Sequence, residues 1–380
     1  MKPIGRGNQI RLLVYSVVLS LLVYTLLKRQ DVDSGKEIGG SSQQPQSLET
    51  KTKGDSMKAD SLQSLESKDT TTNISSKVTT EQEVSELFRP IQFSAIQLQS
   101  WLDQKKGNTP QLAQAKIVAG MLLYDAEMVR AGVESDPGNP QAAYIGATHD
   151  AFSQEEQLQY SRQFFQNAPE NALASYLYAA RLFESGNQDA AIKVLHESME
   201  RHLVDDYSLK TKQLFEEAYL HAGASELTAK LQSWANLQKP YLSDILAFAG
   251  ELDDVADSLP LSEAGNLRQV TASMGKKIRQ RVATGTIIEQ LAGLAIEEKS
   301  MEGLADDEPS HYEGMTTREV KESILHEREE IKAVLKQMDV ASLIRNNPDL
   351  VEAYAEDIWR IGELEAVKRL IKNANNDPPE

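Results

Sequence analysis

The stretch that decides the fold is NALASYLYAARLFESGNQDAAIKVLHESME, residues 171–200. Its first half places apolar side chains on one face at helical spacing. These are Leu173, Tyr176, Leu177, Ala180 and Phe183. Gly186 and Asn187 interrupt the pattern, and a second apolar face follows. It consists of Ala190, Ala191, Val194, Leu195 and Met199. The stretch therefore predicts two antiparallel helices joined by a short turn.

The same stretch resembles the tetratricopeptide (TPR) repeat family, whose units are helix pairs of about 34 residues. The family's large, small and turn positions are filled in register by Tyr178, Ala179, Leu182, Gly186, Ala191, Leu195 and Ser198. Leu182 replaces the usual aromatic residue, Ser175 replaces Trp, and Leu203 lies near the place of the final Pro. The resemblance implies a solenoid whose first helices line a groove for peptides or helices. The groove candidates that it implies are Asn171, Ser175, Tyr178 and Arg181. The alternative is that these four residues serve ordinary packing between helices.

Helical patterning extends on both sides of this unit. Pro137 and Pro169 lie 32 residues apart, which predicts an earlier unit of similar length. Further helices are predicted at 91–104, 111–131, 240–258, 262–282, 284–300, 316–338 and 347–373. An acidic loop is expected at 303–315. The predicted fold is all-α, with TPR-like helical hairpins over 81–238 and a C-terminal helical region over 239–380.

An apolar run near the amino end predicts a membrane anchor. LLVYSVVLSLLVYTLL, residues 12–27, has no charge and spans about 24 Å as a helix. A cleavable signal peptide is the alternative, but no small-residue cleavage site follows Leu27, so 1–29 is predicted to be an uncleaved signal anchor. Residues 30–80 are rich in Ser, Thr and Gln and predict a disordered linker.

Charge fixes the expected orientation and excludes one class of partner. Lys2, Arg6 and Arg11 precede the apolar run, which favours a cytoplasmic amino end and a periplasmic body at the inner membrane. The chain has 57 acidic and 40 basic residues and a net charge of −17. This acidity argues against nucleic acid as a partner, since phosphate binding needs a basic surface. The absence of cysteine excludes disulfides and thiolate metal sites.

The sequence contains no local catalytic or metal-binding motif. His196 and His326 each begin a sequence like the helical zinc-protease motif, but neither has a second histidine at the required spacing. No phosphate-binding glycine loop and no Gly-x-Ser-x-Gly turn occurs. The sequence predicts no enzyme, no cofactor and no metal. A catalytic site assembled from distant segments remains the open alternative.

A basic cluster offers a second candidate binding surface. It consists of Lys276, Lys277, Arg279 and Arg281, with Arg268 upstream. Two interpretations are open: a solvated helix face with ion pairs one turn apart, or a docking site for an acidic partner. The predicted function is a membrane-anchored helical-repeat scaffold for protein–protein interaction in the cell envelope. Its expected partners are another protein or peptide, and the lipid bilayer through residues 12–27. The alternative is an envelope hydrolase or its regulatory subunit.

Overall fold

The computed structural model describes residues 91–281, 285–310, 312, 314–337 and 350–376. The chain divides into two units, 1–77 and 78–380, and all described residues belong to the second. The predicted anchor at 12–27 and linker at 30–80 therefore lie outside the described residues. None of the described helices has both the length and the apolar character that crossing a bilayer requires.

The described residues form α-helices, one short 3-10 helix and no β-strand, so the all-α prediction is confirmed. The first group is α3 (Ala95–Gln104), α4 (Thr109–Leu123), α5 (Ala126–Ser135), α6 (Pro140–Thr148), α7 (Gln154–Asn167), α8 (Ala172–Glu184), α9 (Gln188–Glu197) and η1 (Ser198–Glu200). The second group is α10 (Ser208–His221), α11 (Glu226–Ala235), α12 (Tyr241–Ser258), α13 (Leu261–Arg279), α14 (Ile287–Lys299), α15 (Thr317–Gln337), α17 (Val351–Ile361) and α18 (Glu363–Asn376).

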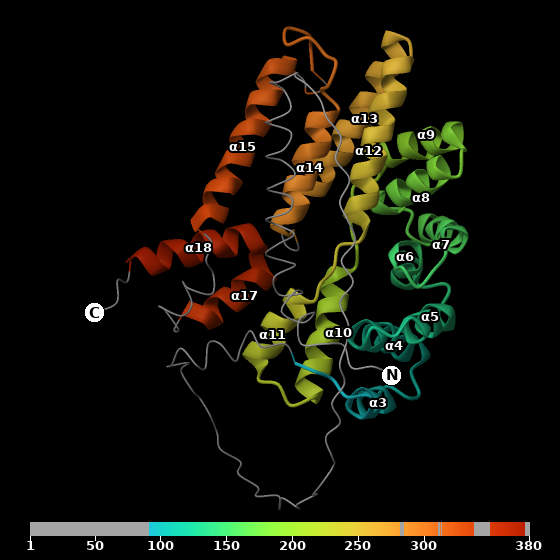
Figure 1. The fold of residues 1–380 in the computed structure, drawn as a ribbon, viewed down its shortest axis with the longest axis vertical. Helices are drawn as coiled ribbons and strands as arrows, with labels where there is room; N and C mark the ends of the chain where they lie inside the picture. Colours follow the sequence, from blue (N-terminus) through green and yellow to red (C-terminus); the bar gives the residue numbers. More distant parts are fainter. Residues whose placement is uncertain (1–90, 282–284, 311, 313, 338–349, 377–380) are drawn as a thin grey trace, which may run out of the picture. The chain divides into compact units, whose positions relative to one another are not determined.

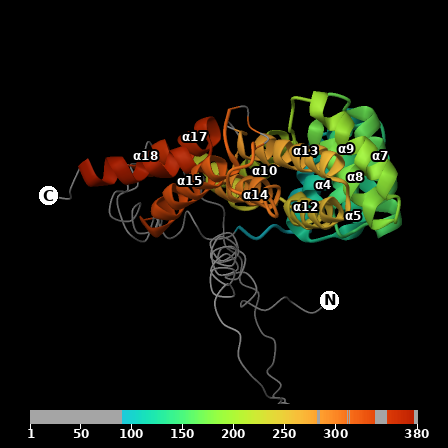
Figure 2. The same cartoon turned by 90° about the horizontal axis from the view of Figure 1, so that it is seen from above.

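Consecutive helices pack as pairs (Figure 1). The pairs are α4 with α5, α6 with α7, α8 with α9, α10 with α11, α13 with α14, and α17 with α18. From α4 to α9 each pair also contacts the next, through α5 with α6 and α7 with α8. After α9 the chain folds back onto the earlier helices: α10 packs on α4, and α12 packs on α8. Helices α12, α13 and α14 run beside one another in both ribbon views (Figures 1 and 2).

Local sequence explains how the predicted hairpin at 171–200 forms. Asn171 caps α8 by accepting a hydrogen bond from the Leu173 amide. Gly186, with φ +82°, ends the helix, and its amide and that of Asn187 donate to the carbonyls of Phe183 and Leu182. These two bonds close a Schellman motif, which needs a left-handed residue at that position.

The main apolar core crosses the predicted domain boundary at 238. It contains Ile117 of α4, Leu177 of α8, Phe248 of α12 and Ile296 of α14. Two smaller cores lie around Trp101 and Tyr219, and around Leu231 and Tyr354. Burial of such side chains is the main stabilising contribution in a helical protein. The regions 81–238 and 239–380 therefore share one core.

Two of the predicted helices are in fact pairs. The prediction of one helix over 111–131 is wrong, because Tyr124 adopts φ +55° and ends α4. The carboxylate of Asp125 then accepts the Met128 amide and begins α5. The prediction of one helix over 347–373 is also wrong, because Gly362 separates α17 from α18 with φ +84°. In both cases apolar residues recur at helical spacing on both sides of the break, so the sequence pattern predicted a single helix.

Candidate functional site

The first groove candidate, Asn171, binds another segment of this chain. Its Oδ1 accepts from the amide of Asp205 at 3.1 Å, and its Nδ2 donates to the carbonyl of Asp205 at 2.6 Å. The side chain is buried and also caps α8. Asn171 therefore joins the start of α8 to the segment that follows η1.

The other groove candidates also lie within the packing of α8. Ser175 is fully buried, and the half-buried Tyr178 ring lies 5.4 Å from the ring of Phe165. Arg181 is buried and pairs with Asp244 of α12 at 2.5 Å. The pairing of Arg181 with Asp244 places α12 against the carboxyl end of α8. In this arrangement all four candidates contact residues of the same chain, and their binding of a partner stays a prediction.

Lys277 of the basic cluster caps a helix end. Its Nζ donates to the carbonyls of Ser198, Met199 and Arg201 at 3.0, 3.1 and 2.7 Å. These carbonyls belong to η1 and the residue after it, where helix geometry leaves acceptors unpaired. Burial lowers the pKa of Lys277. The side chain ties α13 to the end of the α8–α9 pair.

The remaining basic residues also contact this chain. Arg279 pairs with Glu297 of α14 and with Glu327 of α15, the latter at 2.9 Å. The Lys276 ammonium lies 5.0 Å from the centre of the Tyr312 ring. The cluster is therefore largely used to hold helices together. Its role as a docking site for an acidic partner stays a prediction.

Arg281 belongs to a buried ionic cluster that the sequence did not suggest. We define the ionic cluster as Asp206, Lys239, Tyr241, Arg281 and Glu289. Lys239 lies 2.6 Å from Asp206 and 3.1 Å from Glu289, and Arg281 lies 2.7 and 2.5 Å from the same carboxylates. The Tyr241 hydroxyl donates to Glu289 at 2.5 Å. Two carboxylates thus face two cations, and the formal charges cancel.

Electrostatics in the ionic cluster favours the charged form of Asp206. Burial alone would raise the pKa of Asp206, but Lys239 and Arg281 outweigh burial and hold that pKa well below its usual range. Burial raises the pKa of Tyr241 well above its usual value. The cluster joins the segments before α10 and before α12 to the end of α13 and the start of α14. Fixed, mutually paired charges of this kind are suited to holding segments together.

Lys212 of α10 is a separate buried cation. Its Nζ lies 4.3 Å from the ring centre of Trp234 and 4.7 Å from that of Trp359. The residue is fully buried, and among the described residues no acceptor forms a hydrogen bond with its Nζ. Burial, and to a lesser degree the charge of Lys239, lowers the pKa of Lys212 to about 8. The contact between α10, α11 and α17 is therefore built around a cation between two indole faces.

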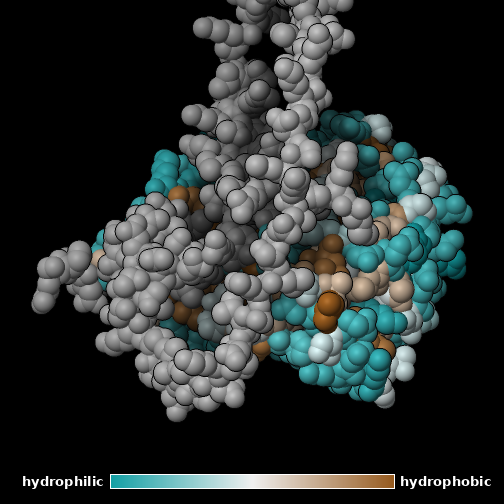
Figure 3. All heavy atoms as spheres, turned by 60° about the horizontal axis from the view of Figure 1, so that its bottom comes forward, coloured by the Kyte–Doolittle hydropathy of each residue, from teal (hydrophilic) through white to brown (hydrophobic). Residues whose placement is uncertain are grey.

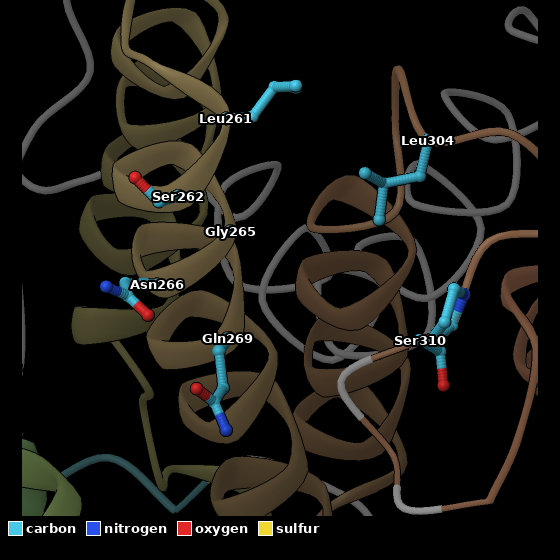
Figure 4. A pocket seen from close by; sticks show the side chains of 8 residues that line it. Leu261, Ser262, Gly265, Asn266, Gln269, Leu304 and Ser310 are labelled. Atoms are coloured by element: carbon cyan, nitrogen blue, oxygen red, sulfur yellow. The ribbon is translucent and has the colours of Figure 1, made fainter.

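An open pocket lies between α13 and the segment 304–310 (Figure 4). Its volume is about 460 Å³. The lining residues are Leu261, Ser262, Gly265, Asn266, Gln269, Leu304, Pro309 and Ser310. None of them is charged. Leu261 is 92% exposed, the highest value among the exposed large apolar side chains of the described residues.

A space-filling view of another face shows hydrophilic side chains around small apolar areas (Figure 3).

Sequence patterns do not predict the ionic cluster, the buried Lys212 or the pocket. Thr286 and Glu289 match the capping-box pattern and do cap α14, but that pattern does not show that Glu289 is buried against two cations. No local pattern marks Lys212 or the pocket, because their partners come from distant segments. Within the described ranges no group of His, Asp or Glu side chains is arranged to hold a metal ion.

Comparison with known proteins gives no relative for this chain. No protein-family model, no curated protein and no solved structure matches it. The similarity to TPR repeats therefore depends on residues 171–203 and on the paired helices. A function must be argued from the surfaces that the fold presents.

Proposed function

We propose that the chain is a non-enzymatic, membrane-anchored scaffold that binds another protein or a peptide in the cell envelope. The observation that carries this proposal is the packing of α4 to α9 as consecutive pairs, each against the next. In helical-repeat proteins such pairs build an extended surface for partners. The residues in TPR register at 178–198 support a TPR-like solenoid over this region.

The non-enzymatic part of the proposal is supported by how the buried charges are used. Asp206 and Glu289 are each paired with both Lys239 and Arg281. General acid–base catalysis needs two titratable groups whose environments drive their pKa values apart next to a substrate. Asp206 and Glu289 are both buried and paired, so neither carboxylate is placed beside a substrate. Turnover by the purified chain in a broad hydrolase screen would contradict the proposal and favour the alternative of an envelope hydrolase.

The location belongs to the same proposal. Residues 12–27 would cross the cytoplasmic membrane, with the amino end in the cytoplasm and the helical body in the periplasm. Lys2, Arg6 and Arg11, which precede the apolar run, support this orientation. Protease added to spheroplasts should then digest the body, whereas a protected body would mean the opposite topology.

Photo-crosslinking in native membranes tests the scaffold function. A crosslinking phenylalanine is placed, one at a time, at exposed apolar positions of the full-length chain. These positions are Ile96, Tyr124 at the end of α4, Leu203, Leu220 and Leu261. We expect a discrete adduct with another protein from at least one of them, because exposed apolar side chains are common at binding surfaces. Absence of any adduct at all five positions would contradict the proposal.

A further inference from the structure

The pocket beside α13 is shaped like a site for an extended peptide. Leu261, Gly265 and Gln269 recur every four residues and Ser262 and Asn266 lie beside them, so the lining forms a stripe along one face of α13. Residues 261 to 269 cover about 12 Å of helix. An extended chain advances about 3.3 Å per residue, so about four peptide residues fit along the stripe.

The chemistry of the lining suits a peptide backbone. The amides of Asn266 and Gln269 are exposed, and each carries both a donor and an acceptor, as a peptide group does. A side chain added at Gly265 would meet no atom within 4 Å, so the middle of the stripe is open to a close approach. Leu261 and Leu304 provide apolar contact; their side chains lie on opposite sides of the opening in Figure 4.

The wall opposite α13 is held in place by α15. The carbonyl of Glu308 accepts from the amide of Thr317 at 2.9 Å and from its hydroxyl at 3.2 Å. The carbonyl of Asp306 accepts from the amide of Arg318 at 3.0 Å. A wall fixed in this way lets a ligand bind without first ordering a loop.

Charge around the pocket selects the kind of peptide. Glu263 follows Ser262 on α13, and Asp307 and Glu308 precede Pro309, so each wall carries exposed acidic residues next in sequence to its lining residues. All three are exposed. Within the described ranges neither Glu263 nor Asp307 forms an ion pair, whereas the neighbouring Asp306 pairs with Arg318 and Lys321. An acidic rim favours a ligand with basic residues on its flanks.

We propose that the pocket between α13 and residues 304–310 binds an extended peptide segment with an uncharged, apolar centre and basic flanking residues. This inference rests on the proposed scaffold function and names the ligand class of one site. The centre lies along Leu261, Gly265 and Gln269, and the basic flanks pair with Glu263 and Asp307.

Fluorescence anisotropy with the full-length chain tests the proposal. The probe is a fluorescein-labelled peptide with a Leu-Ala-Leu-Ala centre and two lysines at each end. Gly265→Leu should weaken its binding about tenfold or more, because the new side chain occupies the pocket. The matched control is Gly250→Leu: Gly250 is also a half-buried helical glycine with nothing within 4 Å of an added Cβ, but it lies on α12. This control should bind as the unchanged chain does.

The charge component is tested separately. Glu263→Lys combined with Asp307→Lys should weaken binding about tenfold. Glu127→Lys on α5 combined with Glu155→Lys on α7 changes the net charge by the same amount away from the pocket and provides the control. A probe with glutamates in place of the lysines should bind at least about tenfold more weakly than the lysine probe.

Several results would overturn the inference. These are equal weakening by Gly265→Leu and Gly250→Leu, equal binding of both probes, or no binding of the lysine probe. Self-association of the chain that Gly265→Leu abolishes would show that a second copy occupies the pocket, and would also overturn it. Crosslinked partners that persist in Gly265→Leu would leave the scaffold function intact while this inference fails.

Discussion

Single glycines show how residue identity sets helix contact in this chain. In the sequence, Gly250, Gly275 and Gly293 all weaken the case for a helix. In the structure, Gly275 and Gly293 lie where α13 and α14 meet. A Cβ on Gly275 would lie 2.6 Å from the carbonyl oxygen of Gly293, and a Cβ on Gly293 would lie 2.6 Å from that of Gly275. The two glycines therefore permit a helix crossing that no other residue type allows.

Gly275→Ala is expected to destabilise the protein by about 1–3 kcal/mol, because the methyl group forces α13 away from α14. The same substitution at Gly250 should stabilise by up to about 1 kcal/mol, since alanine favours helix and the site is open. Denaturant unfolding of both variants measures the difference. Stabilisation by Gly275→Ala would contradict the close crossing.

Lys212 gives a prediction about pH. Its pKa falls from 10.5 to about 8 in the folded chain because the amine is buried. Between these values the unfolded state binds more protons, so the cost of burying the charge is full below pH 8 and is relieved as pH rises. Relative to Lys212→Met, the unchanged chain should gain about 2 kcal/mol of stability from pH 7 to pH 9.5.

Urea unfolding of both chains across this pH range measures the gain. The variant retains an apolar side chain of similar length between Trp234 and Trp359, so the comparison isolates the charge. Asp206, Arg281 and Glu289 act on Lys212 besides Lys239, and they are present in both chains. A stability difference that does not change with pH would contradict the lowered pKa.

At the scale of elements, the sequence predicted most helices and missed specific breaks. The predicted helix at 240–258 is α12, Tyr241–Ser258, and that at 316–338 is α15, Thr317–Gln337. Both have apolar residues recurring at helical spacing without interruption. The breaks at Tyr124 and Gly362 depend on positive φ. Tyrosine rarely adopts positive φ, so the residue type at position 124 does not predict that α4 ends there.

Substitution of Lys277 tests whether the stability of η1 depends on a side chain of α13. Lys277→Met leaves the carbonyls of Ser198, Met199 and Arg201 without this donor. We expect a loss of about 1–3 kcal/mol and faster amide exchange around η1. Lys276→Met is the matched control on the same helix, where only a contact with the Tyr312 ring is removed. It should cost about 1 kcal/mol or less and leave exchange at η1 unchanged.

Over the whole molecule, the sequence predicted that consecutive helices pair, but not that α10 and α12 pack back on α4 and α8. Periodicity reports which face of a helix is apolar, and the paired helices from α4 to α9 follow from it. It does not report which distant helix covers that face. The predicted groove residue Arg181 is paired with Asp244 of α12, a contact across 63 positions. The candidate pocket likewise combines α13 with residues 304–310, and only the folded chain brings these together.

The members of the ionic cluster come from four separate segments, so breaking the cluster should destabilise the fold as a whole. Arg281→Met removes a partner from Asp206 and from Glu289, and a loss of about 3–5 kcal/mol is expected for a broken buried pair. Arg360→Met removes the exposed Arg360 from Asp357, which keeps its pair with Arg369, and should cost about 1 kcal/mol or less. Denaturant unfolding measures both losses.

A double-mutant cycle then tests whether the cluster acts as a unit. Asp206→Asn and Arg281→Met should together cost less than the sum of their separate losses, by about 0.5–3 kcal/mol, because each substitution already removes the pair. Arg281→Met also removes the pair with Glu289, and Asp206→Asn also weakens the pair with Lys239. These losses occur in the single variants as well as in the double variant, so they cancel and the coupling energy reports the Asp206–Arg281 pair. Additive losses would mean that the two side chains stabilise their segments independently. Coupling would instead show that one closed set of charges joins the segments before α10 and α12 to α13 and α14.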